Sequence, residues 1–417
     1  MVYVIGFDGK PLMPTERHGK VRRMLRDGLA KVVKKTPFTI QLLYETTSYT
    51  QDITLGVDAG SKHVGLSAST DKNELYAADV ELRNDITTNL ATRKQYRKDR
   101  RSRNTRYRQP RFDNRVRSKH KGWLAPSVEN KIQTHTKAVE DVCKILPVTK
   151  IVVETASFDI QKIKNPEISG KQYQQGPQLD FWNVREYVLF RDNHTCRCCK
   201  GKSKDRILNV HHIESRKTGG DSPDNLVTLC ETCHKKYHKG EITLPNEIKR
   251  GVSFRHEAFM GIMRWAFYER LKEQHSDKIV SMTYGYITKN NRIEAGLPKT
   301  HYVDARVIAG GANVIPLNEY YYVKKVRCHN RQIHKAKILK GGVKKRNQAP
   351  YIVHGYRLFD KVRYNGKPYF IFGRRVRGDF DIRDLAGNKV NKGSVSYKKL
   401  TLLGTRKSYL YEMRTQQ

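Results

Sequence analysis

The 417-residue sequence lacks the apolar runs of a membrane protein. No stretch approaches the roughly 20 apolar residues that span a bilayer, and the first ten residues, MVYVIGFDGK, contain no apolar signal core. It also lacks internal repeats and long low-complexity segments. Because 37% of its residues are hydrophobic, a wholly disordered chain is excluded. We therefore expect a soluble, cytoplasmic protein with two or more domains.

Acidic residues are scarce compared with basic ones. Asp and Glu number 41 against 81 Lys and Arg, which gives a formal net charge of +40. A compact fold with this charge repels itself unless a polyanion compensates it. Nucleic acid, and RNA above all, is the expected partner. On charge alone, a ribosomal-type RNA binder without catalysis fits as well as a nucleic-acid enzyme.

Cysteines are few as well, and their spacing is not that of a secreted disulfide framework. Four of the seven form two pairs with two-residue gaps, the spacing of a tetrahedral structural zinc site: Cys196, Cys199, Cys230 and Cys233. Cys198 can replace Cys199, although the two-residue gap favours Cys199. The remaining cysteines are scattered, which indicates a reducing compartment.

Histidines lie between and after these cysteine pairs. The residues around His211 and His212 alternate like a strand, so the two side chains point to opposite faces and cannot share one role. His234 and His238 lie on one face of a helix and can bind one metal ion. A strand, turn and helix with a metal between them is the ββα-metal arrangement, in which one histidine binds a divalent ion and another deprotonates the attacking water. Asn225 is expected to orient the catalytic imidazole by a hydrogen bond. A plain zinc finger would leave these residues unexplained.

This stretch resembles an HNH endonuclease domain of the zinc-stapled type. The resemblance implies that His212 is the general base and Asn225 the central asparagine. It also implies a divalent ion, Mg²⁺ or Mn²⁺, bound by His211, His234 and His238. Many relatives carry an acid where His211 stands, and this departure bears on the metal preference.

Three carboxylates lie at the end of apolar strands or at the start of an expected helix. They are Asp58, Glu154 and Asp304, and His301 lies one helical turn before the last of them. A single acid in such a place is more often a turn residue. Together they resemble the split RuvC-like nuclease of the RNase H fold, in the motifs GVDAGSKHVG, IVVETASF and HYVDA. The resemblance implies two Mg²⁺ (or Mn²⁺) ions about 4 Å apart, held by the three acids, with His301 as general base or phosphate contact.

Between the first two of these motifs lies an arginine-rich segment. Residues 93–121 contain fourteen Lys and Arg against two acids. Such a run is usually a solvated face, but this density of one sign predicts a helix that a nucleic-acid backbone orders. Its arginines recur at helical intervals until Pro110: Arg93, Arg97, Arg100, Arg101, Arg103, Arg106 and Arg108.

The order of these parts resembles the two-nuclease RNA-guided effectors of CRISPR systems. This chain is far shorter, has no room for large helical recognition lobes, and carries a Pro-Leu-Met-Pro motif at residues 11–14. It therefore resembles the transposon-encoded IscB family over essentially its whole length. The fold implied is α/β and multi-domain. It comprises a split RNase H-like (RuvC) fold with a bridge helix, an inserted zinc-stapled ββα-metal HNH domain, a small N-terminal α+β domain and a β-rich C-terminal domain.

The resemblance and the composition together give domain boundaries. They are a PLMP N-terminal domain 1–50, RuvC-like part I 51–88, an arginine-rich bridge helix 89–122, RuvC-like part II with a linker 123–178, an HNH domain 179–245, RuvC-like part III 246–316, and a C-terminal domain 317–417. The last is expected to contact RNA and a target-adjacent motif through residues 331–334 and 340–342. Helices are also expected near 15–27, 127–146 and 253–273, and a buried helix from His301 onward. A strand hairpin is expected over 53–61 and 64–68, a strand near 279–287, and a turn at Asn365-Gly366.

The function implied is an RNA-guided, magnesium-dependent endonuclease that cuts both strands of a DNA duplex bearing a short adjacent motif. The HNH site would cut the guide-paired strand and the RuvC-like site the displaced one, in a monomeric ribonucleoprotein of a prokaryotic cytoplasm acting at the nucleoid. A structured guide RNA would supply much of the scaffold. Two alternatives remain. One is an unguided structure- or site-specific nuclease of the resolvase or homing type, and the other is a guided binder or RNA chaperone without cleavage.

Overall fold

The computed structural model divides the chain into two compact units. The first is formed by Met1–Ala156 with Met260–Gln417, and the second by Ser157–Phe259. In the described part of the chain, no helix is long and apolar enough to cross a membrane. The structure describes residues 1–101, 122–155, 167, 169, 172, 178–215, 219–251, 255–327, 350–405 and 408–416, except for the side chains of residues 100, 101 and 255.

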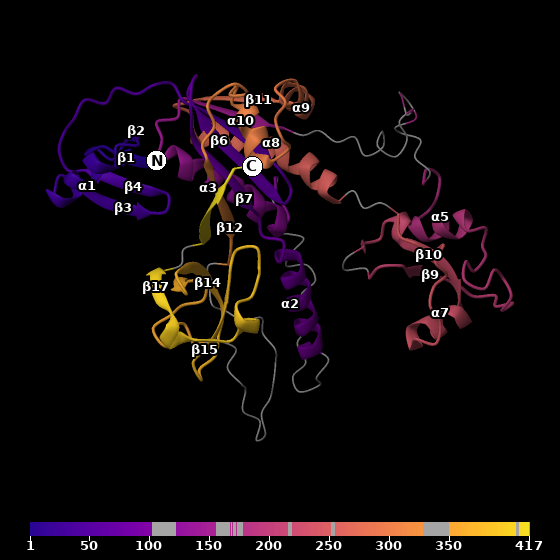
Figure 1. Cartoon of the computed structure of the whole chain (residues 1–417). Helices are drawn as coiled ribbons and strands as arrows, with labels where there is room; N and C mark the ends of the chain where they lie inside the picture. Colours follow the sequence, from indigo (N-terminus) through magenta and orange to yellow (C-terminus); the bar gives the residue numbers. More distant parts are fainter. Residues whose placement is uncertain are drawn as a thin grey trace. The chain divides into compact units, whose positions relative to one another are not determined.

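A small four-stranded sheet begins the first unit (Figure 1, indigo). From edge to edge its strands are β2 (Pro11–Thr15), β1 (Val2–Ile5), β4 (Phe38–Leu42) and β3 (Ala30–Lys35). Strands β1 and β4 run parallel, and the other neighbours are antiparallel. Helix α1 (His18–Arg26) adds Val21 to an apolar cluster with Val2 and Ile40. The first fifty residues thus contain the helix and strands that the sequence predicts.

A seven-stranded mixed sheet forms the centre of the first unit. Its order is β11 (Ile279–Thr283), β8 (Lys150–Glu154), β5 (Thr54–Ala59), β6 (His63–Ser69), β7 (Glu74–Glu81), β12 (Glu319–Lys325) and β18 (Tyr409–Thr415). Strands β5, β6 and β7 are antiparallel, whereas β8 runs parallel to β5 and β11 parallel to β8. The hairpin predicted for β5 and β6 is confirmed. Two strands of the C-terminal region, β12 and β18, complete the sheet.

Helix α10 (His301–Ile308) lies directly on β5 and β6. A Cβ atom at Gly56 would stand 1.9 Å from the carbonyl oxygen of Ala305, and one at Gly65 would stand 1.9 Å from that of His301. No side chain fits in so short a space, so both positions need glycine for the helix backbone to approach the strands. The buried helix predicted from His301 onward is confirmed.

A buried ion pair fixes the same helix to β7. Arg306 on α10 and Glu74 on β7 are 3.6 Å apart, with side-chain exposures of 5% and 0%. Glu74 also accepts hydrogen bonds from the Ser67 hydroxyl (2.6 Å) and the Leu317 amide (3.0 Å). Burying a carboxylate is costly unless its oxygens are paired. These partners satisfy it, and they lock α10 against the sheet.

Other helices lie close to their predicted positions, with one correction. Helix α3 spans Pro126–Cys143 and α8 spans Arg255–Gln274. The strand predicted near 279–287 is too long, because β11 ends at Thr283 and α9 (Gly285–Glu294) follows at once. The Tyr-Gly-Tyr-Ile run after Thr283 has strand-like residues, but the glycine begins a helix there.

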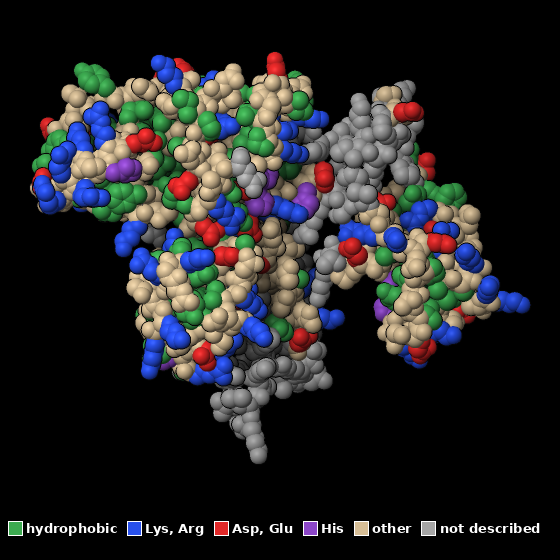
Figure 2. Space-filling view, viewed as in Figure 1, with side chains coloured by type: hydrophobic (Ala, Val, Ile, Leu, Met, Phe, Trp, Pro, Cys, Tyr) green, Lys and Arg blue, Asp and Glu red, His purple; other side chains and the backbone are tan. Residues whose placement is uncertain are grey.

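The arginine-rich helix is present where the structure describes it. Helix α2 spans Ile86–Arg101, and none of its described side chains is buried. Two of the arginines predicted to contact a nucleic-acid backbone, Arg93 and Arg97, lie on this helix. The side chains of Arg100 and Arg101, and the residues Arg103, Arg106 and Arg108, lie outside the described part of the chain. Lysine and arginine side chains are spread over the visible surface of both units (Figure 2).

A five-stranded antiparallel sheet forms most of the remaining C-terminal region (Figure 1, yellow). Its order is β16 (Val395–Ser396), β15 (Asp379–Arg383), β14 (Lys367–Arg374), β13 (Lys361–Tyr364) and β17 (Thr401–Gly404). The predicted turn at Asn365-Gly366 joins β13 to β14, with positive φ at both residues. The segments 331–334 and 340–342, predicted to contact RNA and the target, lie outside the described residues.

The described residues of the second unit include a two-stranded sheet, two α-helices and a 3₁₀ turn. Strand β9 (Leu208–His212) pairs antiparallel with β10 (Leu226–Cys230). The helical elements are α5 (Val184–Arg191), the 3₁₀ turn η3 (Pro223–Asn225) and α7 (Glu231–Lys239). Asn183 caps α5 by accepting from the Glu186 amide at 3.0 Å. Strand, turn and helix thus follow in the predicted ββα order.

The close approach of α10 to the sheet gives a stability prediction. Gly65→Ala is expected to destabilise the first unit by about 1–3 kcal/mol, because the new methyl group pushes the helix off β6. Gly261→Ala is the matched control, since Gly261 is exposed in α8 and its added Cβ meets no atom within 4 Å. That variant should gain up to about 1 kcal/mol from helix propensity. Urea unfolding followed by circular dichroism compares the midpoints, and a Gly65→Ala midpoint equal to wild type would contradict the packing described.

Candidate active site and metal centres

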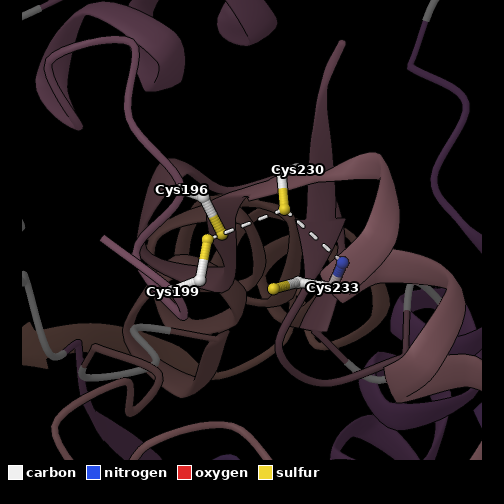
Figure 3. Close-up of side chains that lie close together, drawn as sticks. All are labelled: Cys196, Cys199, Cys230 and Cys233. Carbon is white, nitrogen blue, oxygen red and sulfur yellow. Dashed lines mark hydrogen bonds between the residues drawn. The ribbon is translucent and has the colours of Figure 1, made fainter. Parts of the chain in front are cut away.

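Four cysteine side chains converge in the second unit (Figure 3). Their sulfur atoms all lie within 4.8 Å of one another, and none of the four forms a disulfide. The cluster comprises Cys196, Cys199, Cys230 and Cys233. Of the two cysteines that the sequence leaves open, Cys199 belongs to it, whereas Cys198 packs beside it in the local apolar cluster.

The spacing of these sulfurs fits a tetrahedral zinc site. Two thiolates bound to one Zn²⁺ at about 2.3 Å with tetrahedral angles are about 3.8 Å apart, and the Cys199 and Cys230 sulfurs are 3.8 Å apart. Cys230 also accepts a hydrogen bond from the Ser203 hydroxyl at 3.0 Å and one from the Cys233 amide at the start of α7. Both contacts stabilise a thiolate. The donor set, the spacing and the helix start therefore suit a structural Zn²⁺.

A second cluster consists of three imidazoles. His211 on β9 faces α7, where His234 and His238 lie one turn apart, and the ligand nitrogens of the three lie within 4.8 Å of one another. The two helical Nε2 atoms are 3.2 Å apart. Nitrogens that share one ion at about 2.0–2.1 Å are separated by roughly 3.0–3.4 Å, so this spacing fits a common metal ion.

His211 has the ligand atom that most clearly calls for a metal. Its side chain is buried, and its Nε2 has no hydrogen-bond partner among the described residues. Burial and the neighbouring His234 and His238 lower the pKa of His211 to about 4. A neutral imidazole with a buried, unpaired nitrogen is the state in which histidine binds a metal.

The adjacent histidine points to the other face of β9, as predicted. His212 Nε2 lies 2.9 Å from Asp221 Oδ1, and 29% of the His212 side chain is exposed. If Nε2–H donates to this carboxylate, the lone pair on Nδ1 is left to accept a proton. His212 is therefore placed to act as a general base on a water molecule.

Asn225 has a different role from the one expected of it. Its amide is fully buried: Oδ1 accepts from the Glu214 amide at 2.8 Å, and Nδ2 donates to the carbonyls of Glu214 (3.0 Å) and Gly220 (2.9 Å). These bonds use both N–H donors and one lone pair of Oδ1, and all of them go to the backbone. In this structure Asn225 therefore binds the loop, in contrast to the expected direct hydrogen bond to the catalytic imidazole. It holds the loop between β9 and η3, and that loop carries Asp221, the actual partner of His212.

The acidic residues of the first unit gather at one end of the central sheet. Asp58 on β5 and Glu154 on β8 are opposite each other in the parallel register. Helix α10 brings Asp304 and His301 to the same end, and His301 Nδ1 lies 2.6 Å from Asp58 Oδ2. Three sequence-distant motifs are thus assembled by one sheet and one helix.

Two acids of this cluster each have a basic neighbour. Asp304 Oδ1 lies 2.8 Å from Arg292 Nε on α9, and Asp58 is bound by His301. The three carboxylates do not approach as closely as the cysteines or the imidazoles, whose ligand atoms all lie within 4.8 Å. Arg292 and His301 each offset the negative charge of one acid.

The electrostatics of this cluster favour a cation. Burial raises the pKa of Glu154 to about 7, and the charges of Asp58 and Asp304 add to the shift. Burial likewise raises the pKa of Asp304, helped by the charge of Asp58. The hydrogen bond to Asp58 raises the pKa of His301. Carboxylates held together against burial and mutual repulsion suit an oxygen-bound Mg²⁺ or Mn²⁺.

A second Asp–His pair stacks on this centre, and sequence reasoning missed it. His63 on β6 lies 2.8 Å from Asp79 on β7, and its ring is parallel to that of His301 within 3° at 5.2 Å. Arg292 and Asp221 were missed as well. His63 lies inside the GVDAGSKHVG motif, which is a usable signal, whereas the other three lie in segments with no pattern of their own.

The turn after Asp58 is held from helix α3. Buried His135 bonds to the Gly60 carbonyl through Nε2 at 3.0 Å, and the ammonium group of Lys131 donates to the Ser61 carbonyl at 2.5 Å. These contacts fix the backbone just beyond Asp58. They limit where its carboxylate can point.

Comparison with known proteins identifies two regions of the chain. A family model described as RRXRR protein matches residues 2–176. A second one, described as HNH endonuclease, matches residues 196–240, which hold both metal-type clusters of the second unit. Anaredoxin from Nostoc sp. (strain PCC 7120 / SAG 25.82 / UTEX 2576) is 46% identical over 63 residues, which are 15% of this chain and 79% of that protein.

Solved structures of Cas9 are also among the proteins to which the chain is similar. Streptococcus thermophilus Cas9 in complex with the AGAA PAM is 14% identical, with a TM-score of 0.33 over 62% of this chain and 32% of that one. The same protein with the GGAA PAM is 17% identical, with a TM-score of 0.31 over 46% and 26%. The Type II-C Cas9 enzyme from Actinomyces naeslundii is 18% identical, with a TM-score of 0.17 over 44% and 27%. The chain covers about a quarter to a third of these proteins, and so partial a likeness establishes no shared activity.

The family match and the site geometry agree in the second unit. The HNH region contains the three-imidazole cluster, the cysteine cluster and His212 with its Asp221 partner. The chain thus contains an HNH endonuclease domain, preceded by an RRXRR protein region.

Proposed function

We propose that this chain is an RNA-guided DNA endonuclease of the IscB kind that cuts both strands of a target duplex. The observation that carries the proposal is the presence of two separate nuclease-type centres in one chain. One is the histidine centre of the HNH domain, and the other is the acidic cluster of Asp58, Glu154 and Asp304. One centre is enough to cut one strand. Two centres of different chemistry suit two strands.

The HNH centre is assigned to the guide-paired strand. His211, His234 and His238 would hold a divalent ion, which supplies charge stabilisation for the phosphate oxygens and the leaving group. His212 Nδ1 takes the proton of the attacking water, while Asp221 holds the other ring nitrogen and stabilises the imidazolium that forms. Asn225 keeps the loop of Asp221 in place.

The acidic cluster is assigned to the displaced strand, as a RuvC-like centre in an RNase H-like fold. Three antiparallel strands continued by two parallel ones, with carboxylates at one end of the central pair, support this fold. Asp58, Glu154 and Asp304 would hold Mg²⁺ or Mn²⁺, which activates water and stabilises the leaving oxygen. His301 keeps Nδ1 on Asp58, so its other nitrogen can move a proton or bind a phosphate oxygen.

The guide RNA is proposed from charge and from helix α2. A net charge of +40 needs a resident polyanion. None of the described side chains of α2 is buried, so the helix gains little from a protein core. Contacts from Arg93 and Arg97 to a phosphate backbone supply the missing stabilisation. Base pairing by the guide then provides sequence specificity that so small a protein cannot.

The first prediction concerns the RNA itself. Protein purified gently from a bacterial cytoplasm is expected to carry one discrete, structured RNA with a variable end, because the bound RNA neutralises the arginine-rich helix. Sequencing the bound nucleic acid checks this. Heterogeneous RNA, or none, would instead favour an unguided resolvase or homing-type nuclease.

The second prediction concerns strand choice. In the complex with its RNA, Asp58→Ala should cut only the guide-paired strand and His212→Ala only the displaced strand, since each change removes one centre and leaves the other. Each lost activity should fall by about 100-fold or more, the usual contribution of a general base or metal ligand. Denaturing gels with each DNA strand end-labelled provide the measurement. If both variants cut the same strand, the assignment of the centres is wrong.

The third prediction separates the zinc ligands. Cys199→Ser is expected to lower the zinc content of the purified chain and to destabilise the HNH domain, because one of four ligands is lost. Cys198→Ser, one residue away, should keep full zinc content and normal stability. Elemental analysis and thermal unfolding compare the two variants. Equal zinc loss in both, or in neither, would rule out Cys199 as the fourth ligand.

A further inference from the structure

The two proposed nuclease centres offer different kinds of ligand. The HNH centre has three imidazole nitrogens, and no carboxylate of the described residues joins them within 4.8 Å. The acidic cluster has carboxylate oxygens on Asp58, Glu154 and Asp304. Imidazole suits the later first-row transition ions, whereas carboxylate, carbonyl and water oxygens suit Mg²⁺ and Mn²⁺. Identical metals at both centres, as the sequence leads one to expect, do not fit this difference.

We propose that the histidine centre of the HNH domain selects a transition ion of the zinc, nickel or cobalt class over Mg²⁺, so that the two DNA strands are cut with different metal requirements. This inference rests on the proposed function for its consequence in strand cutting. Its basis in ligand chemistry is independent of any RNA guide. The sequence leads one to expect Mg²⁺ or Mn²⁺ at both centres. The present proposal keeps these ions for the acidic cluster only.

The geometry of the centre points to one compact ion with direct nitrogen ligands. The Nε2 atoms of His234 and His238 are 3.2 Å apart. The centre of the His211 ring lies 5.2 Å from that of His234 and 5.1 Å from that of His238. Mg²⁺ gives up its water shell reluctantly and is seldom held by an all-protein cage. Three converging imidazoles displace several waters at once, which favours ions that bind nitrogen strongly.

Nearby acids do not supply an oxygen ligand. Asp221 is hydrogen-bonded to His212, and the His212 side chain lies on the face of β9 opposite to that of His211. The acids at the two ends of α7 are paired with lysines: Glu231 lies 2.7 Å from Lys235, and Glu241 lies 3.7 Å from Lys239. The donor set therefore stays all-nitrogen unless the chain is changed.

His211 is the position that sets this preference. It is the buried member of the triad, and its Nε2 has no other partner among the described residues. His211→Asp exchanges one nitrogen ligand for an oxygen ligand within the same fold. Because carboxylate oxygen suits Mg²⁺ better than imidazole nitrogen does, this change should shift the centre toward Mg²⁺.

Binding is tested first, without cleavage. The full chain, with its cysteine site filled by Zn²⁺, is titrated with Co²⁺ and followed by visible ligand-field absorption. A band without the sulfur charge-transfer absorption of a cysteine site is expected, and a large molar excess of Mg²⁺ should leave it unchanged. His211→Asp should weaken Co²⁺ binding by at least tenfold, since loss of even an outer-sphere partner costs about 10–100-fold. Displacement of Co²⁺ by Mg²⁺ from the wild-type chain would overturn the inference.

Strand cutting is tested next with the complete RNA complex, freed of trace transition ions by a chelator. In Mg²⁺ alone the displaced strand should be cut and the guide-paired strand should remain intact, until Co²⁺, Ni²⁺ or Zn²⁺ is added. His211→Asp should cut the guide-paired strand in Mg²⁺ alone. Efficient cutting of both strands by the wild-type complex in clean Mg²⁺ contradicts the inference. If no strand is cut with any ion, the proposed function fails, and the Co²⁺ titration still decides the metal preference.

Discussion

The backbone contact between helix α10 and strands β5 and β6 is the constraint on which the acidic centre depends. Without Cβ atoms at Gly56 and Gly65, the helix lies close enough for His301 to bond Asp58, although 243 residues separate them in the chain. The buried Arg306–Glu74 pair then prevents the helix from sliding along the sheet. A helix set farther out would break the contact between His301 and Asp58. The positions of the catalytic-type residues therefore follow from two glycines.

The acids are also buried and repel one another, and a bound metal ion would offset both effects. Burial and mutual repulsion raise the pKa values of Glu154 and Asp304, while Arg292 and His301 partly compensate the nearby charge. The HNH centre offers imidazole nitrogens instead of charged carboxylates. Burial lowers the pKa values of His211 and His234, which favours the unprotonated form of these two imidazoles that a cation needs. The two candidate metal sites therefore differ in their ligands. One has carboxylate oxygens that repel one another, and the other has imidazole nitrogens.

The sequence predicts these centres well where spacing alone fixes geometry. Cysteines with two residues between them, histidines one helical turn apart and adjacent histidines on a strand all lie as their local periodicity requires, and the same holds for the Asn365-Gly366 hairpin. Contacts between distant segments are harder. Asn225 looks like a partner of His212, yet its amide is consumed by the backbone of a loop, and Asp221 in that loop becomes the partner instead. Tertiary hydrogen bonding decides between them, and no periodic pattern encodes it. The pairing of His63 with Asp79 across β6 and β7 is of the same kind.

Helix α2 is rich in basic residues and contributes no buried side chain among those described. Sixteen residues from Ile86 to Arg101 form a helix of which no described side chain is buried. Helices of this length are marginal in water unless an apolar face packs against something. Repulsion among neighbouring arginines makes matters worse. A bound phosphate backbone removes both difficulties at once, because it offsets the charge and replaces the absent core as the surface against which the helix is ordered. In the proposed complex the RNA is therefore part of the folded structure, and the protein can stay small because part of its scaffold is nucleic acid.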